Sequence, residues 1–581
     1  MSFKNLLPYA MQEKPCDAVF RNASFANLCT MEIERADIAV KDGVIVGIGE
    51  GYEAADEIDC AGGLLVPGFI EGHMHVESTM MTPRSFAAAA APHGTATVMA
   101  DPHEIANTCG MEGVRFIKRE SEGLPLDIFY GAPSCVPASC FETPFEEIKA
   151  DGIAELLADG TCTHLGEMMN FPGVYLGDEE VWKKLEAAEG TVITGHAPGV
   201  GGAQLAGYLL GGVTSDHECS TIDEAREKLR RGMYLMIRQG AAARNLKDLA
   251  PLLVESPNLC ARCLAVSDDI TPAFIRERGH MDGCVRELIE CGVPPLAALR
   301  TATLTPAEYF RLYDRGAIAP GKIADLVLVD SLESCRVLRV WKRGRLVAER
   351  GKILESLAPA AVSELPGLKQ TVRTPTPDEL KIKLGPDDKY INVIGVVPRQ
   401  FTTETLTLEP AVIDGCACAD PSRRLAKMAV VEKNRGTGRL ALGFLHNFPL
   451  ERGAVASSVA HDAHNYTCAG MDDVSMSTAL RELARMHGGI VVAEGEKVLA
   501  SLELPVGGLM SLLSADELLE KLADIRAAAE SIRCPGTELL MQLSFMSLSV
   551  IPKLKLTDQG YCDITAGGAQ PLTLAELPDG K

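Results

Sequence analysis

The sequence lacks any uninterrupted apolar run of the about 18 to 20 residues that a membrane-spanning helix requires. The alanine-rich run at residues 86–91 is far too short for that role. The first twenty residues also lack the basic start, apolar stretch and small-residue cleavage site of a secretory signal. We therefore expect a soluble, cytoplasmic protein.

Positive charge is scarce, because 56 Lys and Arg stand against 79 Asp and Glu and give a formal net charge of -23. Such an excess of negative charge repels phosphate backbones and anionic lipid surfaces. We expect neither nucleic acid nor a membrane as partner. A small neutral or cationic ligand fits better.

No regular cysteine framework is present, although the chain contains 18 cysteines. Scattered cysteines in a chain of this size are typical of reduced thiols. Cys260 and Cys263 form a Cys-x-x-Cys with no second pair, so we interpret them as core thiols rather than as a zinc ribbon or redox pair. Internal repeats and low-complexity tails are also lacking.

The length of 581 residues exceeds what one hydrophobic core normally organises. Short apolar runs alternate with turn signals at residues 17–66 and again at 316–352, the pattern of a small antiparallel sheet. We expect residues 1–66 together with 316–358 to form one discontinuous β domain, a small β-sandwich.

Residues 67–315 alternate apolar runs that end in polar residues with helical patterns. This rhythm predicts βα units and a parallel sheet. About 250 residues of such units is the usual size of a (β/α)8 TIM-type barrel, whose active site lies at the carboxyl ends of the strands. Residues 359–581 should form a third, α/β domain, with strand-like runs and a helix at residues 515–531.

Histidines gather in the predicted barrel. His73 and His75 follow an apolar run as His-Met-His, so on a strand both rings point to the same face and could bind one metal. Taken alone, the motif occurs by chance on solvated strands.

Four further candidates each end a strand-like run: Glu167, His196, His217 and Asp268. Each alone could be a hydrogen-bonded polar group of the barrel. Together with His73 they supply imidazole and carboxylate ligands for one or two divalent ions such as Mn, Fe or Zn. A glutamate between two metals would neutralise charge and hold them close together.

The third domain contains a His-Asp-Ala-His-Asn segment with four polar side chains: His461, Asp462, His464 and Asn465. The segment could bind metal itself, close over the barrel mouth, or form a hydrogen-bonded turn. We favour closure, because two histidines three apart with one Asp make an incomplete metal site.

The order His-x-His, Glu, His, His, Asp resembles the binuclear amidohydrolase superfamily. Longer segments across nearly the whole chain resemble the adenine deaminase family: PGFIEGHMHVES, HGTATVMADPHEIANTCG, LGEMMNFPGV, GHAPG, SDHE, RGAIAPGKIADLVLVD, SVAHDAHN and LSFMSLSVIPKLKLTDQG. The resemblance implies hydrolysis of adenine to hypoxanthine and ammonia in purine salvage.

By this resemblance His73 and His75 bind the first metal with Asp268, His196 and His217 bind the second, and Glu167 bridges them. A metal-bridged hydroxide would attack C6 of adenine, since metals lower the pKa of bound water. Two divalent ions are expected, Mn first, with Fe or Zn as alternatives.

Proton transfer needs further groups. The resemblance makes Glu104 the candidate for delivering a proton to N1, oriented by His103 or Asp101, while Asp268 takes the proton of the attacking water. The same Asp-Pro-His-Glu could instead be a turn that caps a helix.

Two segments depart from the family pattern. Family members usually carry Arg-Glu-Gly-Ser at residues 238–241, where this chain has Arg-Gln-Gly-Ala, and a basic, polar stretch at residues 270–273, where it has Ile-Thr-Pro-Ala. We therefore expect Arg238, Gln239 and Asp269 near the substrate.

Two other functions stay open. The chain could hydrolyse another purine or a cyclic amide or amidine on the same binuclear centre, or serve as a catalytically silent scaffold. Adenine is the expected small-molecule partner, and we expect a homo-oligomer.

Overall fold

A computed structural model describes residues 3–241, 244–354, 372–397, 402–532 and 538–577. The chain forms two compact units. The first unit comprises Met1–Pro102, Ile117–Ser134 and Ala150–Ala360, and the second comprises His103–Phe116, Cys135–Lys149 and Ala361–Lys581. The domain boundary that the sequence places at 358/359 lies outside the described residues.

The first unit contains the parallel strands that the sequence predicts. A five-stranded parallel sheet has the order β12-β11-β10-β9-β8, and a three-stranded one has the order β13-β14-β15. The bounds are β8 Phe69–Met74, β9 Thr95–Ala100, β10 Asp127–Ala132, β11 Cys162–Met168, β12 Ile193–Gly195, β13 Ser215–Asp216, β14 Tyr234–Arg238 and β15 Cys263–Val266. The strand-like runs that end at Glu167, His196, His217 and Asp268 form β11, β12, β13 and β15.

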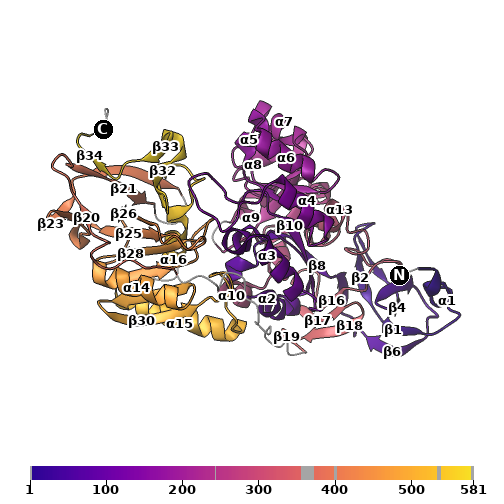
Figure 1. The fold of residues 1–581 in the computed structure, drawn as a ribbon. Helices are drawn as coiled ribbons and strands as arrows, with labels where there is room; N and C mark the ends of the chain where they lie inside the picture. The colour runs from indigo at the N-terminus through magenta and orange to yellow at the C-terminus, as the bar shows by residue number, and fades with distance from the viewer. Residues whose placement is uncertain (1–2, 242–243, 355–371, 398–401, 533–537, 578–581) are drawn as a thin grey trace. The chain divides into compact units, whose positions relative to one another are not determined.

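Single parallel bridges join the two sheets at both ends. Ile193 at β12 pairs with Val213 beside β13, and Met74 at β8 pairs with Asp268 just after β15. Helices separate successive strands, as the alternating pattern predicts (Figure 1). Between these strands lie α2 Pro83–Ala90, α3 His103–Glu120, α4 Ala150–Ala158, α5 Phe171–Leu176, α6 Glu179–Ala187, α7 Gly202–Leu210, α8 Ile222–Arg230 and α9 Leu246–Glu255. Four more follow β15: α10 Pro272–Arg278, α11 Met281–Glu290, α12 Pro295–Thr301 and α13 Leu304–Tyr309.

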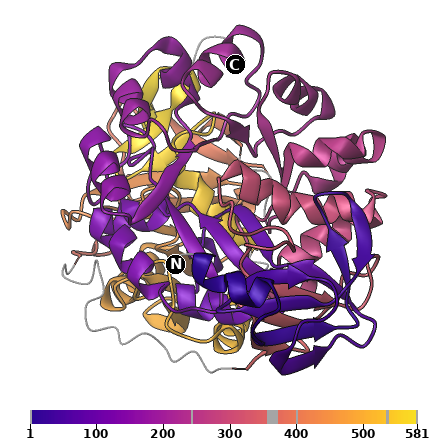
Figure 2. The ribbon, with the colours of Figure 1, turned by 90° about the vertical axis from the view of Figure 1, so that its right-hand side faces the viewer.

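Strands from both ends of this unit share one sheet, of order β19-β18-β17-β16-β7-β2-β3 (Figure 2). Its strands are β2 Ser24–Asn27, β3 Glu32–Arg35, β7 Leu64–Pro67, β16 Leu326–Val329, β17 Val337–Lys342, β18 Arg345–Glu349 and β19 Lys352–Ile353. The predicted discontinuous sheet is confirmed in that β7 pairs with β16.

A second small sheet has the order β5-β4-β1-β6, with β1 Cys16–Arg21, β4 Ile38–Lys41, β5 Val44–Ile48 and β6 Ala54–Asp59; α1 spans Leu7–Ala10. The antiparallel prediction is wrong in part, because β1 pairs with β6 and β2 with β7 in parallel. Apolar alternation sets which face of a strand is buried, but not its direction relative to a neighbour.

Buried side chains of α8, α9, α11, α12 and β14–β16 form an apolar core cluster of this unit. Cys260 and Cys263 belong to it and are buried, as expected of core thiols. No disulfide joins the described cysteines. Among the described helices, none is long and apolar enough to cross a membrane.

Asp127, at the start of β10, forms ion pairs with two buried cations. Its Oδ2 lies 2.7 Å from Arg315 Nη1 and 2.8 Å from Lys342 Nζ. Burial raises the pKa of the carboxyl, but Lys342 and Arg315 together outweigh burial and lower it. The ion cluster therefore ties the parallel strands to β17.

We expect Asp127→Asn to lower the free energy of unfolding at pH 7 by about 1 to 3 kcal/mol, because two buried cations lose a charged acceptor. Since the folded pKa is lowered, this stabilisation is present above the unfolded value of about 3.9 and is lost as the pH falls through the folded value. Urea denaturation at pH 7 and pH 3 measures both effects. Equal midpoints for the two proteins at pH 7 would contradict the assignment.

The second unit is built on a large mixed sheet of order β22-β21-β26-β25-β28-β27-β29-β30, with β34 beside β21. Its strands are β21 Tyr390–Val396, β22 Thr403–Leu408, β25 Leu425–Val431, β26 Leu440–His446, β27 Ala454–Ser457, β28 Tyr466–Gly470, β29 Gly489–Glu494, β30 Lys497–Glu503 and β34 Thr573–Leu574. Helix α14, Asp473–Arg485, packs on β27–β29, and α15, Ala515–Ser531, packs on β29 and β30 (Figure 1). The helix predicted at residues 515–531 is confirmed.

Two three-stranded sheets complete this unit: β20 Ile382–Lys383 with β24 Cys416–Cys418 and β23 Ala411–Ile413, and β31 Lys555–Thr557 with β32 Gly560–Asp563 and β33 Gly568–Gln570. A short helix, α16, spans Glu538–Ser544.

Candidate metal centre

Six predicted ligand residues lie at the carboxyl ends of parallel strands in the first unit. His73 belongs to β8 and Glu167 to β11, whereas His196 and His217 directly follow β12 and β13. In a parallel sheet these ends lie at one edge. The fold therefore gathers residues that are far apart in the sequence, and His75 and Asp268 join them just beyond β8 and β15.

Glu167 lies between two pairs of imidazoles. Its Oε1 lies 3.9 Å from His73 Nε2 and 3.3 Å from His75 Nε2. Its Oε2 lies 2.9 Å from His196 Nδ1 and 3.2 Å from His217 Nε2. Each oxygen of one buried carboxylate thus faces a different histidine pair.

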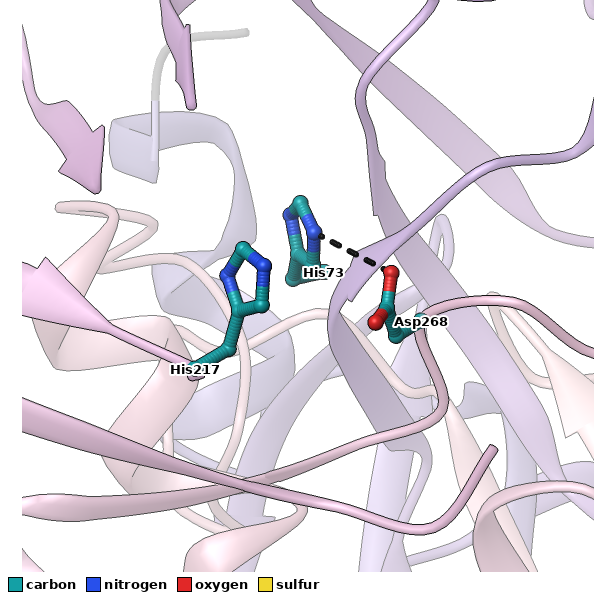
Figure 3. A group of neighbouring side chains, drawn as sticks. All are labelled: His73, His217 and Asp268. Carbon is teal, nitrogen blue, oxygen red and sulfur yellow. Dashed lines mark ion pairs between the residues drawn. The ribbon is translucent and has the colours of Figure 1, made fainter. Parts of the chain in front are cut away.

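Asp268 stands opposite the first pair. Its Oδ1 lies 3.6 Å from His73 Nε2 and 3.2 Å from His75 Nε2. Figure 3 shows His73 directed at Asp268, with the ring of His217 beside it. The rings of His73 and His217 stack with centroids 4.2 Å apart, so the two imidazole pairs adjoin.

The backbone fixes the direction of two of these ligands. His75 Nδ1 lies 3.0 Å from the carbonyl oxygen of Asp101, so this nitrogen carries the proton and leaves Nε2 as the acceptor. Asp268 has a φ of 57°, in the left-handed region that Asp tolerates better than most residues. Its amide donates to the His73 carbonyl oxygen at 3.0 Å.

Both carboxylates are ionised in this setting. Burial raises the pKa of Asp268, but Arg238 and the neighbouring imidazoles lower it well below its usual range. Burial likewise raises the pKa of Glu167, and His217, His196 and His75 together lower it well below its usual range. The site therefore presents two negative charges among four imidazoles.

These residues fit a divalent metal centre. Nε2 of His73 is buried and has no hydrogen-bond partner among the described residues, although a buried imidazole nitrogen normally has one. The groups His73, His75, Glu167 and Glu167, His196, His217 each bring their ligand atoms within 4.8 Å of one another. Imidazole and carboxylate donors suit Mn, Fe and Zn alike.

The other predicted residues of this unit have their own contacts. Arg238 Nη1 lies 2.6 Å from Asp268 Oδ2 and also pairs with Glu218. The Gln239 amide is buried and donates to Glu287. Asp269 accepts a hydrogen bond from Ser78.

The carboxylate of Asp101 accepts the backbone N–H of Glu167 at 2.6 Å. Its predicted role of orienting Glu104 stays a prediction, as do the substrate contacts of Arg238, Gln239 and Asp269.

Polar residues also gather within the second unit. Glu104, in the first turn of α3, has its Oε1 3.3 Å from His461 Nδ1 and its Oε2 4.0 Å from His464 Nε2. His103 Nε2 lies 4.0 Å from Asp462 Oδ1. Of the two groups predicted to orient Glu104, His103 belongs to this unit and Asp101 belongs to the first.

The contacts of His464 fix its tautomer. Its Nδ1 accepts the backbone N–H of Ala460, so Nε2 carries the proton and is directed at Glu104. Asn465 Oδ1 accepts the Lys433 amide. The sequence treated Glu104 and the His-Asp-Ala-His-Asn segment separately, and the contact between them was not foreseen; closure over the metal centre stays a prediction.

Sequence reasoning missed several polar groups next to these clusters. Glu218 lies 3.5 Å from His217 Nε2, and its adjacency to His217 in the chain was the available signal. Glu71 lies in an apolar segment and Glu142 in an irregular one, so no pattern in the sequence marked them. Both carboxylates accept backbone N–H groups. Lys228 is also buried, and the sequence analysis did not single it out.

Two family models match the chain. The amidohydrolase family model matches residues 64–347, and the model of the adenine deaminase C-terminal domain matches residues 400–567. A partial structural likeness links the chain to L-hydantoinase from Arthrobacter aurescens, with a TM-score of 0.46 and 16% identity, covering 59% of this chain and 98% of that chain.

Curated relatives match over nearly the whole length. Adenine deaminase of Oleidesulfovibrio alaskensis is 44% identical over 578 residues, covering 99% of each chain. Adenine deaminase 2 of Carboxydothermus hydrogenoformans is 40% identical over 572 residues, covering 98% of this chain and 99% of the relative. Identity at this level over both matched regions, together with the ligand arrangement of the first unit, means that the chain belongs to the adenine deaminase family of the amidohydrolases.

Proposed function

We propose that this protein hydrolyses adenine to hypoxanthine and ammonia on a binuclear metal centre. The observation that carries the proposal is the position of Glu167, with one oxygen toward His73 and His75 and the other toward His196 and His217. The substrate follows from the curated relatives, which are named adenine deaminases. Purine salvage is the corresponding metabolic role.

The amidohydrolase family implies a divalent metal centre. His73, His75 and Asp268 would hold one ion, His196 and His217 the other, and Glu167 both. Mn is the proposed ion, with Fe or Zn as alternatives. When bound, the ions lower the pKa of water and so supply the nucleophile near neutral pH.

Asp268 is the proposed acceptor for the proton of the attacking water. Arg238, 2.6 Å from its Oδ2, keeps the carboxyl ionised and therefore ready to accept. The water oxygen forms a bond to C6, and the bond from C6 to the exocyclic nitrogen breaks. The amine leaves as ammonia after gaining a proton.

Glu104 is the proposed donor of a proton to N1, which makes C6 more electrophilic. Its two oxygens lie next to His461 and His464, and His464 presents an N–H toward the carboxyl group. His103 is the proposed orienting group. Closure over the metal centre by residues 461–465 belongs to the same proposal.

The fold that would carry this chemistry is a (β/α)8 barrel formed by β8–β15. Support comes from the strand order and from the two parallel bridges that link the sheets at Ile193 and at Met74. Residues 1–66 and 316–358 would form the composite β-sandwich domain, and residues 359–581 the C-terminal α/β domain. We further propose a cytoplasmic homo-oligomer.

A different purine, or a cyclic amide or amidine, is the second candidate substrate, because Gln239 replaces the usual Glu and its amide is engaged by Glu287. Ile270, where the family is polar, is buried. A catalytically silent scaffold is the third possibility, and it is disfavoured by the complete ligand set.

The deciding experiment follows the ultraviolet spectrum of adenine with Mn-loaded protein, with ammonia assayed in parallel. Conversion to the hypoxanthine spectrum with equimolar ammonia is expected. Two bound metals without any change of adenine would redirect the proposal to a panel of other purines and cyclic amides. Failure to bind metal would favour the scaffold.

A further inference from the structure

Three buried carboxylates that are not proposed metal ligands hold the backbone next to those ligands. Glu71 accepts the amide of His73 at 3.0 Å and that of Ser267, which precedes Asp268, at 3.1 Å. Asp101 accepts the amide of Glu167. Its carboxylate occupies the space where a Cβ at position 166 would lie, so Gly166 is needed there.

Asp216 is the third such carboxylate, and it serves the second histidine pair. Its Oδ1 accepts the amide of Ala197, the residue after His196, at 2.7 Å. Its Oδ2 accepts the amide of Glu218, the residue after His217, at 3.2 Å. One side chain thus links the backbone beside both proposed ligands of the second metal.

Asp216 also contacts a buried ammonium. Lys228 Nζ lies 3.0 Å from Asp216 Oδ2, and the two side chains are 1% and 0% exposed. The same Nζ donates to the carbonyl oxygen of Ala197 at 2.6 Å and to Glu224 Oε1 at 2.8 Å. All three protons of the ammonium therefore have acceptors.

Glu224 extends this network to the next loop residue, because its Oε1 also accepts the amide of Gly199 at 2.8 Å. Lys228 and Glu224 both belong to α8, one turn apart, so a single helix anchors the loops that follow β12 and β13. Burial lowers the pKa of Lys228, but Asp216 and Glu224 outweigh burial and raise it. The ammonium stays charged.

We propose that the Asp216–Lys228 pair sets the distance between His196 and His217. The pair thereby positions the ligands of the second metal and not those of the first. The proposal rests on the assignment of these histidines to that metal. The pair contacts the backbone on both sides of the second site, whereas the first pair, His73 and His75, is held by Glu71 and by the Asp101 carbonyl oxygen. Burying an ion pair costs desolvation energy, so its position beside the ligands is consistent with a positional role.

Lys228→Met tests the proposal through Mn2+ titration of the metal-free protein, with bound and free ion separated by electron paramagnetic resonance. Outer partners of metal ligands typically affect affinity 10- to 100-fold. We expect affinity for the second equivalent of Mn2+ to fall at least about tenfold, and that for the first to change less than about threefold. Lys228→Arg should restore part of the loss.

Lys183→Met is the matched control, because Lys183 lies on helix α6 of the same unit and is exposed, in an ion pair with Glu180. Both equivalents should bind it as in the parent protein. Thermal denaturation verifies that each variant is folded. If Lys228→Met does not fold, Glu224→Gln removes one negative partner of the ammonium while Asp216 still balances its charge. A several-fold loss confined to the second equivalent is then expected.

Two results would overturn the proposal: a folded Lys228→Met or Glu224→Gln protein that binds both equivalents as the parent does, or one that loses both equally.

Excess Mn2+ should also restore kcat in Lys228→Met with little change in KM. Because the titration does not depend on turnover, a parent protein that binds two metals but leaves adenine unchanged would refute the proposed substrate and leave this test intact.

Discussion

Glu167→Gln is expected to lower kcat/KM for adenine by about three orders of magnitude, equivalent to about 4 kcal/mol of transition-state stabilisation. Glu167 is the carboxylate whose two oxygens face both imidazole pairs. A neutral amide would remove one of the negative charges that offset the repulsion between the two metal ions. Steady-state kinetics, together with the bound metal per chain, measures the effect, and we expect at most one tightly bound ion.

Glu180→Gln serves as the control, since Glu180 is exposed on α6 and contacts Lys183. It should keep two metals and the parent rate. A Glu167→Gln protein that binds two ions tightly and retains its rate would show that Glu167 does not bridge them.

Glu104→Gln is expected to lower kcat for adenine by about a hundredfold to ten-thousandfold, the range of general acid-base catalysis. The amide keeps the size of the side chain but cannot carry a proton to N1. Both metals should remain bound, because the six proposed ligands are unaltered. Kinetics, with metal content measured on the same preparation, separates this loss from that of Glu167→Gln.

Glu112→Gln is the matched control in the same helix, where Glu112 is exposed and pairs with Arg115. It should behave as the parent protein. Normal turnover by Glu104→Gln with unchanged metal content would remove Glu104 from the mechanism and leave proton delivery to another group.

The local sequence pattern predicts where several of the proposed metal ligands lie on their strands. His73 and His75 alternate on a strand, and the polar residues after β11–β15 stand where parallel strands end. Because side-chain direction along a strand has a period of two, the face shared by these histidines follows from spacing alone. Helix α15 was equally predictable, from apolar periodicity.

Other features depend on contacts between residues far apart in the chain. The parallel pairing of β1 with β6 cannot be read from alternation, which is the same for either strand direction. The interaction of Gln239 with Glu287 is likewise a tertiary fact, so the substitution at 239 could be noticed in the sequence but its side chain could not be placed.

By itself, therefore, the sequence determined the element types and the six candidate ligands, because these depend on local periodicity and residue type, and its longer segments identified the family by resemblance. Only the tertiary structure decided which oxygen of Glu167 faces which histidine pair, that Arg238 contacts Asp268, and that Lys228 is buried. The physical reason is that a charged side chain on an amphipathic helix is expected to be solvated. Lys228 is buried because Asp216 and the Ala197 carbonyl oxygen, brought to it by other elements, replace its water.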